Sequence, residues 1–263
     1  MKELLVIKIG GRVLQSPVMD SHLGNVISLV KGPRHPLLIH GGGQEITEKL
    51  DIFGKNTRFV KGQRYTDSES VEIVEMVLAG INQRIVGRIN LLGGKAIGIS
   101  GKDAFLVEAK KLEGEHDLGY VAEVRKVNPE ILYLLLNNGY IPVISPMAMD
   151  RKGVTYNINA DVFAAQFSAT IGAERLVFLT DVPGILENPE DEKSVIGEIR
   201  IEEVKELIRK RIITEGMIPK LDSCVEALRK GVKEIDILDG REKDALLPLL
   251  KEETELGGTK IKR

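Results

Sequence analysis

The sequence predicts an α/β protein, a three-layer αβα sandwich with a mostly parallel central sheet. Short apolar runs alternate with longer segments of helical periodicity along nearly all 263 residues, which is typical of strand–helix–strand units. Several runs are continuously apolar, which indicates strands buried on both faces, as in a parallel sheet. Two of the runs end in glycine-rich turns, and ligands bind at such strand ends in open α/β sheets.

The predicted strands are the apolar runs bounded by glycine, proline or charged residues. The first ends in Gly10–Gly11, and the second ends in Gly41–Gly43. The strands of the alternating scheme cover 3–9, 36–40, 94–99, 140–145, 175–180, 234–238 and 259–261. Two hairpins interrupt the scheme, one formed by 105–109 with 120–124 and one within 149–156, because polar, glycine-containing links separate their apolar halves.

Helices are predicted between these strands. Asp67 is expected to cap the longest one, because Val71, Val74 and Leu78 follow it at helical spacing. The predicted helices cover 17–31, 44–53, 67–92, 130–138, 159–171, 201–211, 217–230 and 244–251. With strands and helices alternating in this way, helices should cover both faces of the sheet.

Composition excludes several classes of protein. The 37 basic and 39 acidic residues give a net charge of -2, so there is no general attraction to nucleic acid or to an anionic membrane. The single cysteine, Cys224, excludes a disulfide framework and argues against a cysteine-built zinc site. No apolar run reaches membrane-spanning length and no leader is recognisable, so we expect a cytoplasmic protein. The four scattered histidines indicate neither a metal site nor a general base.

A lysine and two glycine runs are the first candidates for a site. Lys8 interrupts a buried apolar strand, where a cation is costly unless it faces an anion. Glycines at a strand end can aim backbone N–H groups at a phosphate. A tight turn is the simpler interpretation of Gly10–Gly11 alone, whereas Gly41–Gly43 before a helix favours a ligand. Neither run forms a Walker A or Gly-x-Gly-x-x-Gly motif.

Further candidates lie at predicted helix starts. Arg64 could hold a carboxylate, although the local pattern favours a solvated arginine. Either Asn157 or Asn159 could cap the next helix and place Asp161 in its first turn, and this arrangement fits a plain cap as well as a site. Lys220 begins a helix, where the dipole disfavours a cation unless an anion compensates.

Taken together, these residues indicate phosphoryl transfer. That reaction needs charge neutralisation and alignment but little covalent chemistry. Lys8 and Lys220 would neutralise the phosphates, the glycine-loop N–H groups would hold oxygens, and Asp161 would align the two lysines.

The ordered motifs resemble the amino acid kinase family, in its acetylglutamate kinase branch, over essentially the whole chain. The motifs are Lys8–Gly11, His40–Gly43, Arg64–Asp67, Asn157–Asp161, Asp181–Leu186, Gly216–Leu221 and Gly258–Ile261. The resemblance implies a carbamate kinase-like fold with one continuous sheet. Residues 1–155 would form the lobe for the amino-acid substrate and dimerisation, and 156–263 the ATP-binding lobe.

The resemblance also implies a role for individual residues. Lys8, Lys220 and Asp161 would be catalytic, and Gly42, Gly43, Arg64 and Asn157 would bind the substrate. Gly10, Gly11 and Gly41 would form a backbone cradle for phosphate, and Asp181, Gly184 and Met217 would lie near ATP. The implied cofactors are ATP and Mg²⁺, with the ion held largely through phosphates and no metal site built from side chains.

At two positions the sequence resembles the family branch that acts on carrier-bound substrates. Tyr65 follows Arg64, and Arg12 follows Gly10–Gly11. This resemblance implies ATP-dependent phosphorylation of the side-chain carboxylate of α-aminoadipate or glutamate on a small acidic carrier protein, in lysine and, in some archaea, arginine or ornithine biosynthesis. The alternatives are an N-acetylglutamate kinase of arginine biosynthesis, a non-catalytic amino-acid or nucleotide sensor, and a kinase for another acceptor. The retained lysines argue against a sensor.

An acidic carrier would need a docking surface. The inserted hairpin region supplies five basic residues, which are Lys102, Lys110, Lys111, Arg125 and Lys126. Such charges would mainly raise the association rate, although a solvated hairpin is the simpler interpretation. Because the chain starts directly in its first predicted strand, we expect a homodimer without arginine control. We expect no nucleic-acid or membrane partner.

Overall fold

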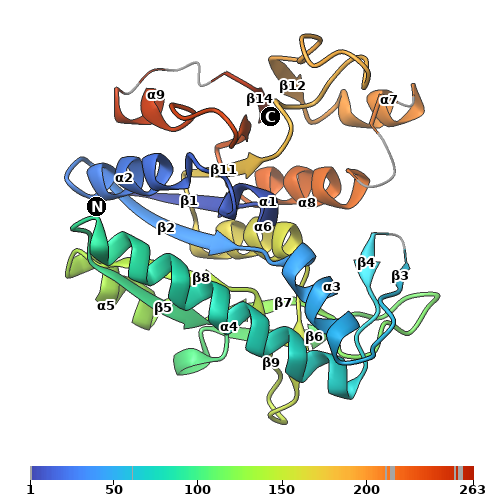
Figure 1. Cartoon of the computed structure of the whole chain (residues 1–263). Helices are drawn as coiled ribbons and strands as arrows, with labels where there is room; N and C mark the ends of the chain where they lie inside the picture. The colour runs from blue at the N-terminus through green and yellow to red at the C-terminus, as the bar shows by residue number, and fades with distance from the viewer. Residues whose placement is uncertain (1, 61, 211, 214–216, 252, 254–256) are drawn as a thin grey trace.

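An eight-stranded sheet runs through the molecule in the order β12-β14-β13-β11-β1-β2-β8-β5 (Figure 1). The computed structural model describes residues 2–60, 62–210, 212–213, 217–251, 253 and 257–263. All neighbouring strands are parallel except β13 and β14, so the predicted mostly parallel sheet is confirmed. The strands are β1 (Glu3–Ile9), β2 (Arg34–His40), β5 (Ala96–Ser100), β8 (Ile141–Ser145), β11 (Arg175–Thr180), β12 (Glu198–Arg200), β13 (Glu234–Asp239) and β14 (Thr259–Lys262).

Helices cover both faces of this sheet, which confirms the α/β sandwich (Figure 1). One apolar core lies beneath α1 (Gly11–Leu14), α2 (Met19–Val30), α3 (Gly43–Ile52), α4 (Ser68–Leu91) and α9 (Leu247–Leu250). The other lies beneath α5 (Glu130–Asn137), α6 (Ala160–Ile171), α7 (Val204–Arg209) and α8 (Ile218–Arg229). The Asp67 carboxylate caps α4 by accepting a bond of 2.7 Å from the Ser70 N–H, as predicted.

The alternation along β1 decides where its lysine points. Leu5, Ile7 and Ile9 belong to the core under α2 and α4, whereas Val6 belongs to the core under α6 and α8. Successive side chains of a strand face opposite sides of the sheet. Lys8 therefore points toward the layer that holds α6 and α8.

A second sheet of four strands forms from the two predicted hairpins, which are both confirmed. β6 (Val107–Lys111) pairs antiparallel with β7 (Ala122–Val127), and β9 (Met147–Met149) pairs antiparallel with β10 (Thr155–Asn157). A contact between β6 and β9 joins the hairpins. The Val124 N–H donates to Gln166 Oε1 of α6 at 2.8 Å, which ties this sheet to the helix layer.

Several short elements differ from the prediction. The helices predicted at 201–211 and 244–251 shrink to α7 and α9, and residue 211 lies outside the described residues. A two-stranded ribbon of β3 (Phe59–Val60) and β4 (Gln63–Arg64), strand β12 and a 3₁₀ turn, η1 (Asp103–Phe105), were not predicted. Elements of two or three residues are too short for a hydrophobic period to indicate them.

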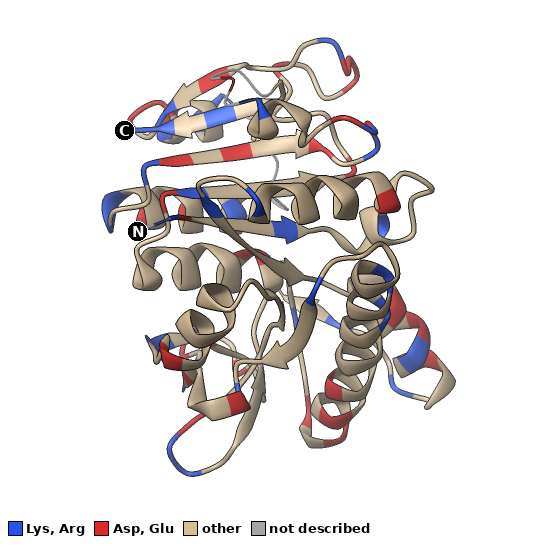
Figure 2. Cartoon of the chain, turned by 90° about the vertical axis from the view of Figure 1, so that its left-hand side faces the viewer, with Lys and Arg blue, Asp and Glu red and all other residues tan. Residues whose placement is uncertain are grey.

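Charged residues of both signs are interspersed over the view in Figure 2. At the sheet end near the C-terminus, β14 carries lysines and its neighbour β13 carries carboxylates, and Lys260 lies opposite Asp236. Opposite charges on facing strands stabilise such a pairing. No helix within the described ranges is both long enough and apolar enough to cross a membrane.

Candidate active site

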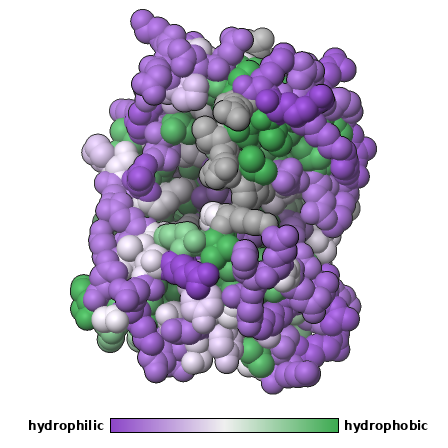
Figure 3. Space-filling model, turned by 90° about the vertical axis from the view of Figure 1, so that its right-hand side faces the viewer, coloured by the Kyte–Doolittle hydropathy of each residue, from purple (hydrophilic) through white to green (hydrophobic). Residues whose placement is uncertain are grey.

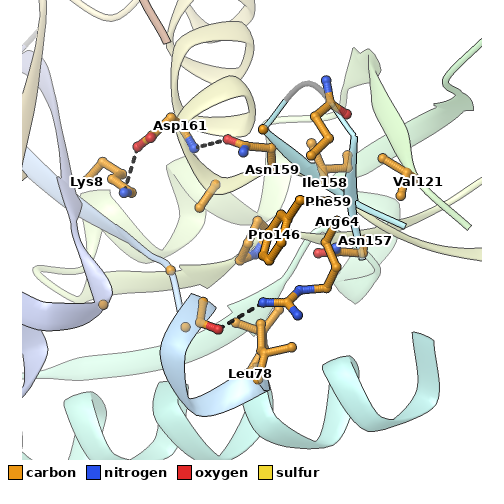
Figure 4. Close-up of a pocket in the computed structure, with 18 residues that line it drawn as sticks. Lys8, Phe59, Arg64, Leu78, Val121, Pro146, Asn157, Ile158, Asn159 and Asp161 are labelled. Atoms are coloured by element: carbon orange, nitrogen blue, oxygen red, sulfur yellow. Dashed lines mark hydrogen bonds and ion pairs between the residues drawn. The ribbon is translucent and has the colours of Figure 1, made fainter. Parts of the chain in front are cut away.

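Lys8, Asp161 and Lys220 meet although the sequence separates them widely. Lys8 Nζ lies 2.6 Å from Asp161 Oδ1, and Lys220 Nζ lies 3.5 Å from Asp161 Oδ2. The residues come from β1, the first turn of α6 and the first turn of α8. Figure 4 shows Asp161 between Lys8 and the capping residue of α6. The structure thus brings the three predicted catalytic residues together.

The start of α6 fixes the position of this carboxylate. Asn159 Oδ1 accepts hydrogen bonds from the N–H groups of Asp161 at 2.9 Å and Val162 at 3.2 Å. Asn159 is therefore the cap, which leaves the other predicted candidate, Asn157, to line a cavity. A carboxylate in the first turn is favoured by the helix dipole.

The two ammonium groups control the ionisation of Asp161. Burial alone would raise the pKa of Asp161, but the charges and hydrogen bonds of Lys8 and Lys220 outweigh it and lower the pKa to about 2. The carboxylate is therefore ionised at neutral pH. Two cations around one anion leave a positive charge uncompensated, which suits the site to an anionic ligand.

The two glycine runs face each other across the site. A Cβ atom added to Gly11 would lie 3.6 Å from the Gly43 nitrogen, within van der Waals contact. A Cβ atom added to Gly42 would lie 2.6 Å from Ile81 Cδ1 of α4, so a larger residue there would force the Ile81 side chain to move. The loop after β2 is thereby pressed between the helix layer and the loop after β1.

Two cavities share this centre. The smaller, of about 190 Å³, contains Gly41, Gly42 and Asn157 in its wall, and the larger, of about 570 Å³, contains Asp181 and Lys220. Both are lined by Lys8, Gly11, Gly43, Phe59, Arg64 and Asp161. Gly10 lines the larger one. The parallel strands end toward the right in Figure 1, and Figure 3 shows a hollow near the middle of that face.

Arg64 is a buried cation at the junction of the cavities. Its guanidinium donates to the Gly43 carbonyl and to Thr47 Oγ1, both at 2.9 Å, and to Thr57 Oγ1 at 3.1 Å. The group also lies 4.8 Å from the centre of the Phe59 ring. Figure 4 shows Arg64 reaching toward the start of α3. The interpretation of Arg64 as a solvated arginine, which the local pattern favours, is wrong, because the residue is only 7% exposed.

The charge of Arg64 has no counter-ion within the described part of the chain, since no carboxylate there forms an ion pair with it. Burial lowers the pKa of Arg64, and the charge of Asp51 only partly offsets this effect. A buried cation without an anionic partner is costly. The arrangement therefore favours a ligand that brings a negative charge to Arg64.

Arg12 belongs to the larger cavity although we did not predict it as a site residue. It forms an ion pair with Asp181. Burial would raise the pKa of Asp181, but its hydrogen bonds and the charges of Arg12 and Lys220 together outweigh this effect, so the pKa is lowered. The signal for it in the sequence is its place directly after Gly10–Gly11, at the end of the first strand.

Two predicted ATP-binding residues line neither cavity. A Cβ atom added to Gly184 would lie 2.7 Å from Thr259 Oγ1, so close packing against β14 accounts for this glycine. Met217 caps α8 and packs against the core on that face, and the adjacent Gly216 of its motif lies outside the described residues. Their role near ATP stays a prediction. Within the described ranges, no cluster of three or more His, Cys, Asp or Glu residues could hold a metal ion.

The burial of His40, the residue before the glycine run, leads us to expect that the protein loses stability in acid. Burial lowers its pKa from 6.5 to about 4. Between these values the unfolded ring binds a proton and the folded ring does not, so the free energy of unfolding should fall by about 3 kcal/mol as pH drops through this window. Urea denaturation of the wild type and His40→Asn would measure the effect. Equal slopes against pH for both proteins would contradict it.

The cavities gather ammonium, guanidinium and backbone N–H groups around the ionised carboxylate of Asp161. Such a site stabilises a migrating phosphoryl group by charge and position rather than by covalent chemistry. The fold and the site together define a phosphotransferase of the α/β class. A sequence model of the amino acid kinase family matches residues 3–239, and the chain belongs to this family.

Individual relatives agree with this assignment. The acetylglutamate kinase of Archaeoglobus fulgidus is 45% identical over 254 residues, which cover 92% of this chain and 88% of that protein. Among solved structures, N-acetylglutamate synthase from Neisseria gonorrhoeae superposes with a TM-score of 0.86 at 22% identity, over 99% of this chain and 59% of that one. Carbamate kinase from Giardia superposes with a TM-score of 0.69 at 15% identity, over 100% and 99%. At these identities the two structures support the fold alone.

Proposed function

We propose that this kinase transfers the γ-phosphoryl group of ATP to the side-chain carboxylate of N-acetylglutamate, a step of arginine biosynthesis. A carboxyl group as acceptor agrees with the family and with the name of the relative from Archaeoglobus fulgidus. The observation that carries the proposal is Arg64, a buried cation without a carboxylate partner in the described chain. It lines the same cavity of about 190 Å³ as Lys8. A small dianionic amino acid would supply the missing charge.

The reaction needs no general base, because the acceptor is already ionised. An acceptor oxygen forms a bond to the γ-phosphorus, the bond from that phosphorus to the β,γ-bridging oxygen breaks, and ADP leaves with the electron pair. Lys8, at the junction of the cavities, would neutralise the migrating group, and Lys220, in the larger cavity, would neutralise the leaving phosphate. Asp161 holds both ammonium groups in place. Mg²⁺ would be bound mainly by the nucleotide phosphates, where it adds further positive charge.

The two cavities suggest which part of the chain binds which substrate. Residues 1–155 would supply most of the acceptor site through the glycine run of β2 and Arg64, with Asn157 completing the wall. Residues 156–263 would supply Asp181 and Lys220 for the phosphates of ATP. Gly184 and Met217 would lie farther along the nucleotide. Homodimer formation stays a prediction.

The carrier-bound acceptor is the second candidate, and Arg12 and Tyr65 are its support in the sequence. The proposed docking surface is largely neutralised, because four of its basic residues have acidic partners. The ion pairs are Lys102 with Glu75 at 2.6 Å, Lys110 with Glu123 at 3.5 Å, Lys111 with Asp117 at 3.0 Å and Arg125 with Glu108 at 2.9 Å. Paired charges attract an acidic carrier weakly, so we favour the free N-acetyl amino acid.

A direct comparison of acceptors tests this choice. We expect kcat/KM for N-acetylglutamate to exceed that for N-acetyl-α-aminoadipate by about tenfold or more, because one extra methylene in a fitted cavity costs about 1–3 kcal/mol. ADP release with ATP as donor measures both, and N-acetylaspartate serves as the shorter control. A higher kcat/KM for glutamate or α-aminoadipate on an acidic carrier would replace the first candidate with the second.

A further inference from the structure

His40 ties helix α4 to the glycine run, although the proposed reaction gives it no part. Its side chain is fully buried. Nδ1 lies 3.1 Å from the Gly41 carbonyl oxygen, and Nε2 lies 3.2 Å from the amide nitrogen of Asn82. A carbonyl oxygen only accepts and an amide NH₂ only donates. The ring is therefore neutral, with its proton on Nδ1 and its lone pair on Nε2.

The orientation of the Asn82 amide has an independent cause. Its nitrogen also donates to the Val143 carbonyl of β8 at 2.9 Å, so the nitrogen and the oxygen cannot be exchanged. A Cβ atom at Gly98 of β5 would lie 1.8 Å from Asn82 Oδ1, so glycine at 98 makes room for the amide. The Val143 carbonyl thus orients the amide, the amide orients the ring, and the ring orients the Gly41 carbonyl.

The peptide group between Gly41 and Gly42 is the last member of this series of hydrogen bonds. The described residues contain no cis peptide bond, and in a trans peptide the carbonyl and the following N–H point in opposite directions. With the Gly41 carbonyl held toward the ring of His40, the Gly42 N–H points away from it. Neither the Gly42 nor the Gly43 N–H has an acceptor among the residues that the structure describes, and both glycines line the smaller cavity.

We propose that His40 is a positioning residue whose Nδ1–H holds the Gly41 carbonyl so that the Gly42 N–H is presented to the acceptor cavity. There the N–H would donate to an oxygen of the acceptor carboxylate or of the migrating phosphoryl group. The identity of that oxygen rests on the proposed function, whereas the loop geometry does not. A donor fixed in advance stabilises developing charge without reorganisation. Burial lowers the pKa of His40 to about 4, which keeps the ring neutral and in this role at neutral pH.

Two amide substitutions separate the two bonds of the ring. In His40→Asn the shorter amide can replace Nδ1 and donate to Gly41, whereas in His40→Gln the longer amide can replace Nε2 and accept from Asn82. We expect His40→Gln to lower kcat by about 10- to 100-fold with an unchanged KM for ATP. We expect His40→Asn to keep kcat within about fivefold of the wild-type value. Its melting temperature should nevertheless fall more than that of His40→Gln, because Asn82 loses its partner.

Two results in this experiment would overturn the positioning role. One is a wild-type kcat in His40→Gln, and the other is a loss of kcat that follows the loss of melting temperature across both variants. Failure of the wild type to phosphorylate N-acetylglutamate would instead contradict only the proposed function.

A spectroscopic measurement tests His40 without any substrate. In the isotope-labelled chain at neutral pH, the long-range proton–nitrogen spectrum should show the His40 proton on Nδ1. The amide resonance of Gly42 should shift more in His40→Gln than in His40→Asn. A proton on Nε2, or the reverse order of shifts, would overturn the positioning role whatever the acceptor is.

Discussion

Replacing Lys220 by alanine is expected to lower kcat by about 10²–10³-fold, the usual effect of removing one electrostatic contact to a transition state. The KM for the acceptor should change little, because Lys220 lines the larger cavity and not the smaller one. Lys8→Ala should lower kcat at least as much. Lys8 is only 7% exposed and makes the shorter bond to Asp161, so its loss also leaves the carboxylate less well paired.

Steady-state ADP release with saturating ATP and N-acetylglutamate measures both variants. Lys31→Ala is the matched control, since this exposed lysine at the end of α2 lines neither cavity. Melting temperatures identify any variant that fails to fold, and Lys220→Ala should retain most of its stability because Lys220 makes the longer, weaker contact with Asp161. A kcat within threefold of the wild type in Lys220→Ala would remove this lysine from the mechanism.

The sequence predicted the layers well because the information for them is local. Apolar runs and helical periods lie within windows of a few residues, and the strands β1, β2, β8, β11 and β13 fall close to the predicted ranges. The alternation within β1 even indicates on which face Lys8 lies. Ribbon β3–β4 was missed because each strand has only two residues.

The site was predictable only in part, because its geometry depends on contacts between distant elements. No local pattern joins Lys8 to Lys220. The two were paired because phosphoryl transfer needs positive charge on two phosphates, and family resemblance agreed with that pairing. The sequence around Arg64 is typical of an exposed arginine. The side chain is buried only because Phe59 and the start of α3 pack against it. His40 and Asn82 are 42 positions apart, and their bond requires the space that Gly98 leaves. A glycine in a strand can indicate a close approach, but it does not say what approaches.

Arg64→Ala is expected to weaken acceptor binding more than any other substitution in the smaller cavity. A hydrogen-bonded pair of charges contributes about 1.5–3 kcal/mol, so the loss of two such bonds from one guanidinium would raise KM for N-acetylglutamate by about 10²-fold or more. The KM for ATP should stay within about twofold, because the phosphates would lie nearer Lys220 and Asp181. Initial rates with each substrate varied in turn give both constants.

Arg64 also supports the loop that it touches, so binding and stability must be separated. Its bonds to the Gly43 carbonyl and Thr47 would be lost in the alanine variant. Arg64→Lys keeps the charge but loses the planar fork, so we expect it to retain stability better while KM for the acceptor still rises about tenfold. Arg58→Ala is the matched control, because Arg58 is exposed and lies 5.9 Å from the Tyr65 ring centre, outside both cavities. An unchanged acceptor KM in Arg64→Ala would mean that another group binds the carboxylate, and the proposal of an acidic acceptor would lose its main support.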